Sequence, residues 1–168
     1  MTWQLALAVA AALFGAVIVW RVRPSFGPRR AGKDGRAALA AARARILTAA
    51  TPAERALALC DAGDARAAMG GRLTGALGYY LRAMRSDPTA AAPVVRAAQG
   101  LARRPRMLES LLWRRLGSSA WDGPNRASAI AALAELERVY ARSLRNRSRA
   151  NAMRFAHALL QAPEPKRD

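Results

Sequence analysis

The chain has 168 residues and a formal net charge of +17, and 52% of its residues are hydrophobic, many of them alanine. That length suits one modest domain, and an alanine-rich core suits closely packed helices better than a thick β-sandwich. A single cysteine, Cys60, excludes an internal disulfide and a cysteine-based zinc site. Nearly all basic residues are arginines, a bias that a GC-rich genome also produces, so part of the charge need not reflect a binding partner.

The N-terminus contains a long apolar run. Residues 2–20, TWQLALAVAAALFGAVIVW, lack any ionisable side chain. As a helix they would span roughly 28 Å, close to the ~30 Å hydrocarbon core of a bilayer. Trp3 and Trp20 stand at the two ends, where indoles favour the membrane interface. A cleaved signal peptide would instead need a basic start and a small-x-small cleavage site. The sequence therefore predicts a retained transmembrane anchor over residues 1–20.

Positive charge flanks only one side of this predicted anchor. Arg21 and Arg23 begin a basic linker, residues 21–35, that is rich in proline and glycine. The positive-inside rule then predicts that the N-terminus lies outside and that residues 21–168 lie in the cytoplasm. We expect a single-pass protein of a bacterial-type inner membrane, whose interface residues are Trp3, Trp20, Arg21 and Arg23.

The remainder of the chain is predicted to be all-α, because no segment shows the period-2 alternation of a strand. We expect a helical domain over residues 36–161 and a disordered tail over residues 162–168. Its boundaries follow start and stop signals such as the capping box TPAE, the glycine pair GG and the dipeptide DP. The predicted helices span residues 36–50, 52–68, 73–86, 89–104, 105–116, 125–146 and 148–160.

One stretch of this domain has a more specific pattern, with a glycine turn followed by the spacing A-x3-Y-x2-A-x4-P. The residues that carry it are Gly71, Ala76, Tyr80, Ala83 and Pro88. The pattern resembles the second half of a tetratricopeptide repeat, a helical hairpin of 34 residues, with tyrosine in place of phenylalanine. The resemblance covers about one unit, residues 57–90, and the first half of that unit departs from the family pattern.

The resemblance implies an array of about three stacked helical hairpins, whose first helices line a concave surface that binds another protein. In the best unit, the positions that line this surface correspond to Ala58, Asp61, Ala65, Ala68 and Met69. In the later hairpins we expect Gln99, Arg103, Arg138 and Arg142 on the same surface.

No set of residues indicates catalysis, a cofactor or a metal site. His157 is the one histidine and has no carboxylate close to it in sequence, so we interpret it as an ordinary helix residue. Cys60 lies in an Ala/Leu helix and is interpreted as a small core residue. Asp61 and Asp64 are three residues apart and could share a helix face, but aspartates near a helix end are common. We therefore expect that the protein is not an enzyme.

A basic cluster spans the end of the helix predicted over 125–146 and the residues after it, and it comprises Arg142, Arg145, Arg147 and Arg149. Three interpretations remain open: a solvated helix face, a patch for an acidic protein or anionic lipid, and a nucleic-acid site. Nucleic acid is the weakest of these binding interpretations, because few aromatic residues interleave with the arginines to stack on bases. The sequence favours a membrane-anchored adaptor that binds an acidic or membrane-associated protein. The alternative is a basic helical domain that binds nucleic acid or anionic lipid head groups.

Overall fold

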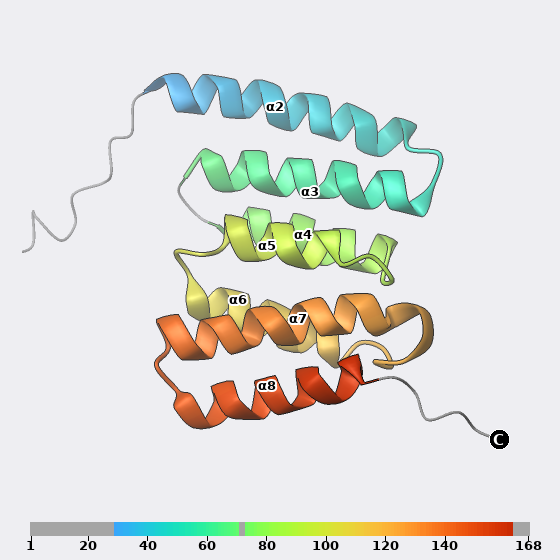
Figure 1. Cartoon of the computed structure of the whole chain (residues 1–168). Coiled ribbons are helices and arrows are strands. Elements are labelled where there is room, and N and C mark those ends of the chain that lie inside the picture. Colours follow the sequence, from blue (N-terminus) through green and yellow to red (C-terminus); the bar gives the residue numbers. More distant parts are fainter. Residues whose placement is uncertain (1–28, 71–72, 163–168) are drawn as a thin grey trace, which may run out of the picture. The chain divides into compact units, whose positions relative to one another are not determined.

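The computed structural model describes residues 29–70 and 73–162, and all regular secondary structure in this part of the chain is helical, so the predicted all-α class is confirmed. A 3₁₀ turn, η1, spans Gly123–Asn125, and a π-helical turn, η2, spans Val139–Ser143. The α-helices are α2 (Arg29–Thr48), α3 (Pro52–Ala68), α4 (Thr74–Ser86), α5 (Ala92–Gly100), α6 (Pro105–Leu116), α7 (Arg126–Arg138) and α8 (Arg147–Gln161) (Figure 1).

The capping box predicted before α3 is present. The Thr51 hydroxyl accepts a hydrogen bond from the Glu54 backbone N–H at 3.1 Å, and the Glu54 carboxylate accepts one from the Thr51 N–H at 3.3 Å. Pro52 occupies the first helical position, where its missing N–H costs nothing. Gly70 follows α3 with a φ of 73°, the left-handed conformation that glycine adopts without strain. Local signals therefore set both ends of this helix.

Other helix boundaries differ from the sequence-based prediction. Helix α2 begins at Arg29, so residues 29–35 of the predicted linker are helical. One reason is tertiary: Gly35 is buried, and a Cβ there would collide with the side chain of Met69 at the end of α3. Glycine at this position therefore permits α2 to approach α3 closely. Helix α5 ends at Gly100 rather than residue 104, and α7 changes to the π-helical turn at Val139.

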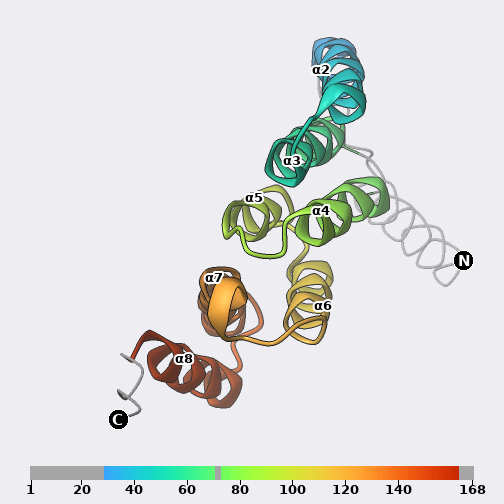
Figure 2. The ribbon, with the colours of Figure 1, turned by 90° about the vertical axis from the view of Figure 1, so that its right-hand side faces the viewer.

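The helices contact near neighbours in the chain. Helix α3 contacts α4 and α5, α4 also contacts α5 and α6, α5 contacts α6 and α7, and α7 contacts α8. These contacts arrange the middle helices in two rows, with α5 beside α7 in one row and α4 beside α6 in the other (Figure 2). Helix α2 joins through a small apolar cluster formed by Leu39 and Ala42 with Ala62 and Ala65 of α3.

Tyr80 of α4 lies at the centre of this packing and is fully buried. A Cβ at Gly63 of α3 would lie 2.7 Å from its ring, and one at Gly100 of α5 would lie 2.9 Å from its Cζ. The two glycines therefore create the space that the ring fills between α3 and α5. Ala76 and Ala83 of α4 are also fully buried, whereas Pro88 lies exposed after the helix and Gly71 falls outside the described residues.

A buried arginine holds the second half of the domain together. Arg115 of α6 is 4% exposed, and it donates hydrogen bonds to the Ser128 hydroxyl at 3.1 Å, the Pro88 carbonyl at 2.6 Å and the Ser119 hydroxyl. Burial lowers the pKa of this guanidinium. Because its acceptors come from α7 and two loops, Arg115 fixes α6 against each of them.

Within the described ranges, no helix combines the length and the apolar character needed to cross a bilayer. The predicted anchor over residues 1–20 lies outside those ranges, and so do the predicted interface residues Trp3, Trp20, Arg21 and Arg23. The anchor therefore stays a prediction from sequence.

Candidate partner-binding surface

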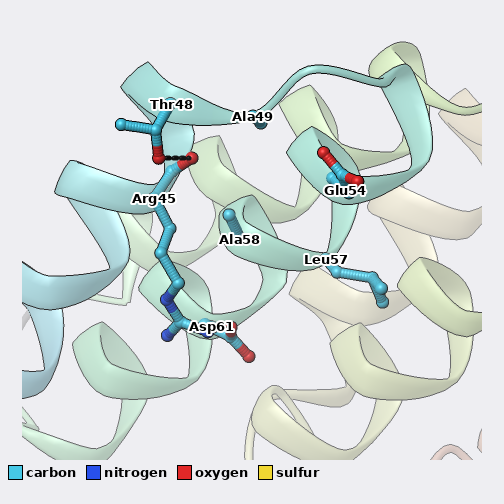
Figure 3. A pocket seen from close by; sticks show the side chains of 7 residues that line it. All are labelled: Arg45, Thr48, Ala49, Glu54, Leu57, Ala58 and Asp61. Carbon is cyan, nitrogen blue, oxygen red and sulfur yellow. Dashed lines mark hydrogen bonds and ion pairs between the residues drawn. The ribbon is translucent and has the colours of Figure 1, made fainter.

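The surface of interest runs over α3, α5 and α7, which contact one another in that order. Its first hollow, of about 300 Å³, lies between α2 and α3. Figure 3 shows Arg45 of α2 reaching across it toward Asp61 of α3, with Glu54 and Leu57 further along α3. Leu57 is 48% exposed although it is a large apolar side chain. The full lining consists of Arg45, Thr48, Ala49, Glu54, Leu57, Ala58 and Asp61.

A chain of charged and polar side chains extends from this hollow across four helices. Arg45 of α2 forms an ion pair with Asp61 at 2.8 Å, and Asp61 pairs with Arg96 of α5 at 2.6 Å. Arg96 also donates from Nε to Asp64 at 2.9 Å, and the Tyr80 hydroxyl donates to Asp64 at 2.6 Å. Asp61 thus links α3 to α2 and α5, and Asp64 links α3 to α5 and α4, a role that the interpretation as ordinary helix-end aspartates missed.

The network perturbs the titration of its members. Burial lowers the pKa of Arg96, but its hydrogen bonds to Asp61 and Asp64 and their negative charges outweigh burial, and the net pKa is raised. Burial raises the pKa of Tyr80, and the hydrogen bond to Asp64 and the charge of that carboxylate raise it further. Burial also raises the pKa of the neighbouring Cys60 to about 11. At neutral pH the arginine is therefore charged, and the phenol and the thiol are neutral.

A second hollow, of about 130 Å³, lies where α5, α6 and the end of α7 meet. Its apolar part includes Leu108 and Val139, and its polar part includes Glu135, which pairs with Arg138. The complete lining is Ala98, Ala102, Pro105, Leu108, Glu135, Arg138, Val139, Arg142 and Ser143. Arg138 and Arg142, both predicted on the partner-binding surface, thus border one hollow.

The structure divides the predicted basic cluster into two kinds of residue. Arg149 pairs with Glu109 of α6 at 3.2 Å and lies over the Tyr140 ring, with its Cζ 5.5 Å from the ring centroid. Arg142, Arg145 and Arg147 are exposed and form no ion pair with another described residue. Arg103, which follows α5, is also exposed and forms no ion pair with another described residue. Exposed cations without a protein partner remain available to a ligand.

Some of the predicted surface positions lie elsewhere. Met69 is half-buried and packs against Gly35 and the apolar cluster between α2 and α3, and its place on the partner-binding surface stays a prediction. Ala65 is a buried member of that same cluster. Gln99 and Ala68 are exposed.

Cys60 and His157, the two residues considered singly for chemistry, lie on different helices, α3 and α8. Cys60 is fully buried beside Leu59 and Ala83, and the His157 ring lies within hydrogen-bond distance of Gln161 on the last helix. Residues 29–70 and 73–162 contain no group of three or more histidine, cysteine or acidic side chains placed to hold a metal ion. Comparison with known protein families, curated proteins and solved structures finds no match to the chain.

Proposed function

We propose that the protein is a membrane-anchored adaptor whose helical domain resembles a tetratricopeptide array and binds another protein in the cytoplasm. The anchor is residues 2–20, and their position at one end of a basic linker places the helical domain next to the inner face of the membrane. Anchoring confines the domain to two dimensions, which raises its effective concentration toward membrane-associated partners. In this proposal the protein is a scaffold and carries out no catalysis of its own.

The spacing of contacts between helix pairs supports the repeat interpretation. Hydrogen bonds between successive pairs join residues at separations close to the 34 residues of a tetratricopeptide unit. Arg96 of α5 donates to Asp61 of α3 at a separation of 35 residues, and Arg43 of α2 donates to Tyr79 of α4 at a separation of 36. The row α3–α5–α7 would then correspond to the first helices, which line the binding surface in such arrays.

The observation that carries the binding proposal is the pair of hollows on this row. The first hollow combines the exposed Leu57 with charged groups on both sides, and the second is bordered by arginines. Partly apolar hollows with a few convergent polar groups are the usual form of binding sites. The unpaired arginines also favour the second candidate function, binding of nucleic acid or anionic lipid head groups, which would fall steeply with rising salt.

Site-specific crosslinking in intact cells tests the proposal. A photo-crosslinking amino acid replaces Leu57 in the first hollow, and the matched control carries it at Arg85, which is exposed on α4. After detergent extraction, we expect one protein to be crosslinked from position 57 and not from position 85. The same cells test the anchor, because alkaline carbonate should leave the full chain in the membrane pellet. Equal crosslinking from both positions, or release by carbonate, would contradict the proposal.

A further inference from the structure

The second hollow and the arginines around it form a strongly basic corner. The segments that line the hollow or directly continue from it, residues 98–109 and 135–149, contain eight arginines and three glutamates. Each glutamate is already occupied: Glu109 pairs with Arg149, Glu135 with Arg138, and Glu137 with Arg154. The excess positive charge is therefore carried by exposed side chains. We call the second hollow together with Arg103, Arg142, Arg145 and Arg147 the basic corner.

One of these arginines has a backbone conformation that is unfavourable for residues other than glycine. Arg145 has a φ of 52°, and it is the one residue other than glycine with a positive φ in the described part of the chain. It follows the helix end at which the Leu144 N–H donates to the Val139 carbonyl and the Asn146 N–H to the Tyr140 carbonyl. Helix ends usually carry glycine in this conformation, as α3 does at Gly70. An arginine here costs stability and gains no ion pair within the described chain.

The hollow at the corner suits one apolar side chain. Its volume of about 130 Å³ is close to that of the ~150 Å³ cavities that accept benzene. The buried side chains of Ala98, Leu108 and Val139 line it, and so does the exposed Arg142. A ligand that enters it would therefore place an apolar group inside and negative groups outside, against the free guanidinium groups.

We propose that the basic corner binds an acidic segment of the partner protein, with one apolar side chain of that segment in the second hollow. This inference rests on the proposed adaptor function and specifies the partner's chemistry. Arginine–carboxylate pairs supply charge complementarity and speed association, and the apolar side chain supplies specificity. The apolar side chains in the hollow favour a protein segment over nucleic acid, because none of the residues that line the hollow is aromatic and could stack on a base.

The test uses the full chain in a nonionic detergent and a fluorescent peptide probe, in which one leucine is flanked by short runs of glutamate. Fluorescence anisotropy measures its binding. A second peptide replaces the leucine by serine, and a single-stranded oligonucleotide of equal charge serves as the nucleic-acid probe. We expect the leucine peptide to bind most tightly, and its affinity to fall as salt is added.

Two variants separate the role of charge from that of the hollow. The double variant Arg142→Gln/Arg145→Gln removes two exposed, unpaired charges. It should lower the affinity for the leucine peptide by about tenfold or more without lowering the melting temperature. Ala102→Phe fills the hollow from an exposed lining position. The affinity for the leucine peptide should then fall to that for the serine peptide. The matched control, Arg55→Gln with Arg85→Gln, removes the same charge from α3 and α4 and should bind like the parent.

The proposal is overturned if the control weakens binding as much as the Arg142/Arg145 variant, because the effect would then be one of total charge. Equal binding of the two peptides, or tighter binding of the oligonucleotide, would overturn it as well. These results would not contradict the adaptor function if a protein is still crosslinked from position 57 in cells. Loss of that crosslink would instead remove the adaptor function itself.

Discussion

The packing of Tyr80 against Gly63 predicts that glycine-to-alanine substitution lowers stability at Gly63 and raises it at Gly78, a glycine that does not contact the ring. In a helix interior, glycine to alanine normally stabilises by about 1 kcal/mol, because alanine loses less backbone entropy on folding. Gly63 of α3 should behave in the opposite way. Its new Cβ would lie 2.7 Å from Tyr80 Cε1 and 3.0 Å from Cδ1 and Cζ, all atoms of a rigid ring.

The ring has little room to move away from Gly63. Gly100 closes its other side, since even a Cβ there would meet the ring, and the hydroxyl is held by Asp64 at 2.6 Å. Inserting a methyl group into a packed core costs about 1–3 kcal/mol. After subtraction of the gain of about 1 kcal/mol in helix propensity, we expect Gly63→Ala to lower the free energy of unfolding by up to about 2 kcal/mol.

Thermal unfolding of the full chain, followed by far-UV circular dichroism, measures the effect. The matched control is Gly78→Ala in α4, where a Cβ meets nothing within 4 Å, and this variant should be stabilised by about 1 kcal/mol. Tyr80→Ala should itself cost about 3–5 kcal/mol, and in that background Gly63→Ala should become stabilising. If Gly63→Ala and Gly78→Ala shift the melting temperature in the same direction, the ring does not occupy the space between α3 and α5.

Two further predictions concern backbone strain and titration. Arg145→Gly should raise the free energy of unfolding by about 1 kcal/mol, because glycine adopts the left-handed φ of 52° without the Cβ penalty, and a lower melting temperature would contradict that φ. Cys60 should make stability fall as pH rises from about 9 to 11. The unfolded thiol loses its proton at its ordinary pKa, whereas burial raises the folded pKa to about 11, so the unfolded state binds fewer protons in that range. Chemical denaturation at several pH values should show this slope reduced in Cys60→Ala, and an unchanged slope would contradict the burial of the thiol.

The fold class and several helix ends could be predicted because their signals are local. The capping box at Thr51 and Glu54 and the left-handed glycine at position 70 act within a few residues of the chain. The start of α2 at Arg29 could not be predicted in this way. It places Gly35 against Met69, residues that are distant in sequence, and a linker rich in glycine gives no local sign of that contact.

The candidate surface was predictable in outline but not in its connections. The three-residue spacing of Asp61 and Asp64 indicated a shared helix face, yet their partner Arg96 lies on a different helix and carries no signal of its own. Arg115 is a similar case, because its acceptors Ser128 and Pro88 are neutral and far away in sequence. An arginine in an arginine-rich chain gives no sign that it is buried, so tertiary packing alone identifies it.

The order in which helices contact one another has a consequence for how the chain is made. From α3 to α8, the α-helices that contact one another lie no more than two helices apart in the chain, so each new helix has its partners among the helices made just before it. Most of the structure can therefore assemble in step with translation, from α2 toward α8, with low contact order. The ion pairs of Asp61 and Asp64 with Arg96 form later than the contacts between α3 and α4, because Arg96 lies on α5. Synthesis of α5 is thus the step at which the first three helices become fixed.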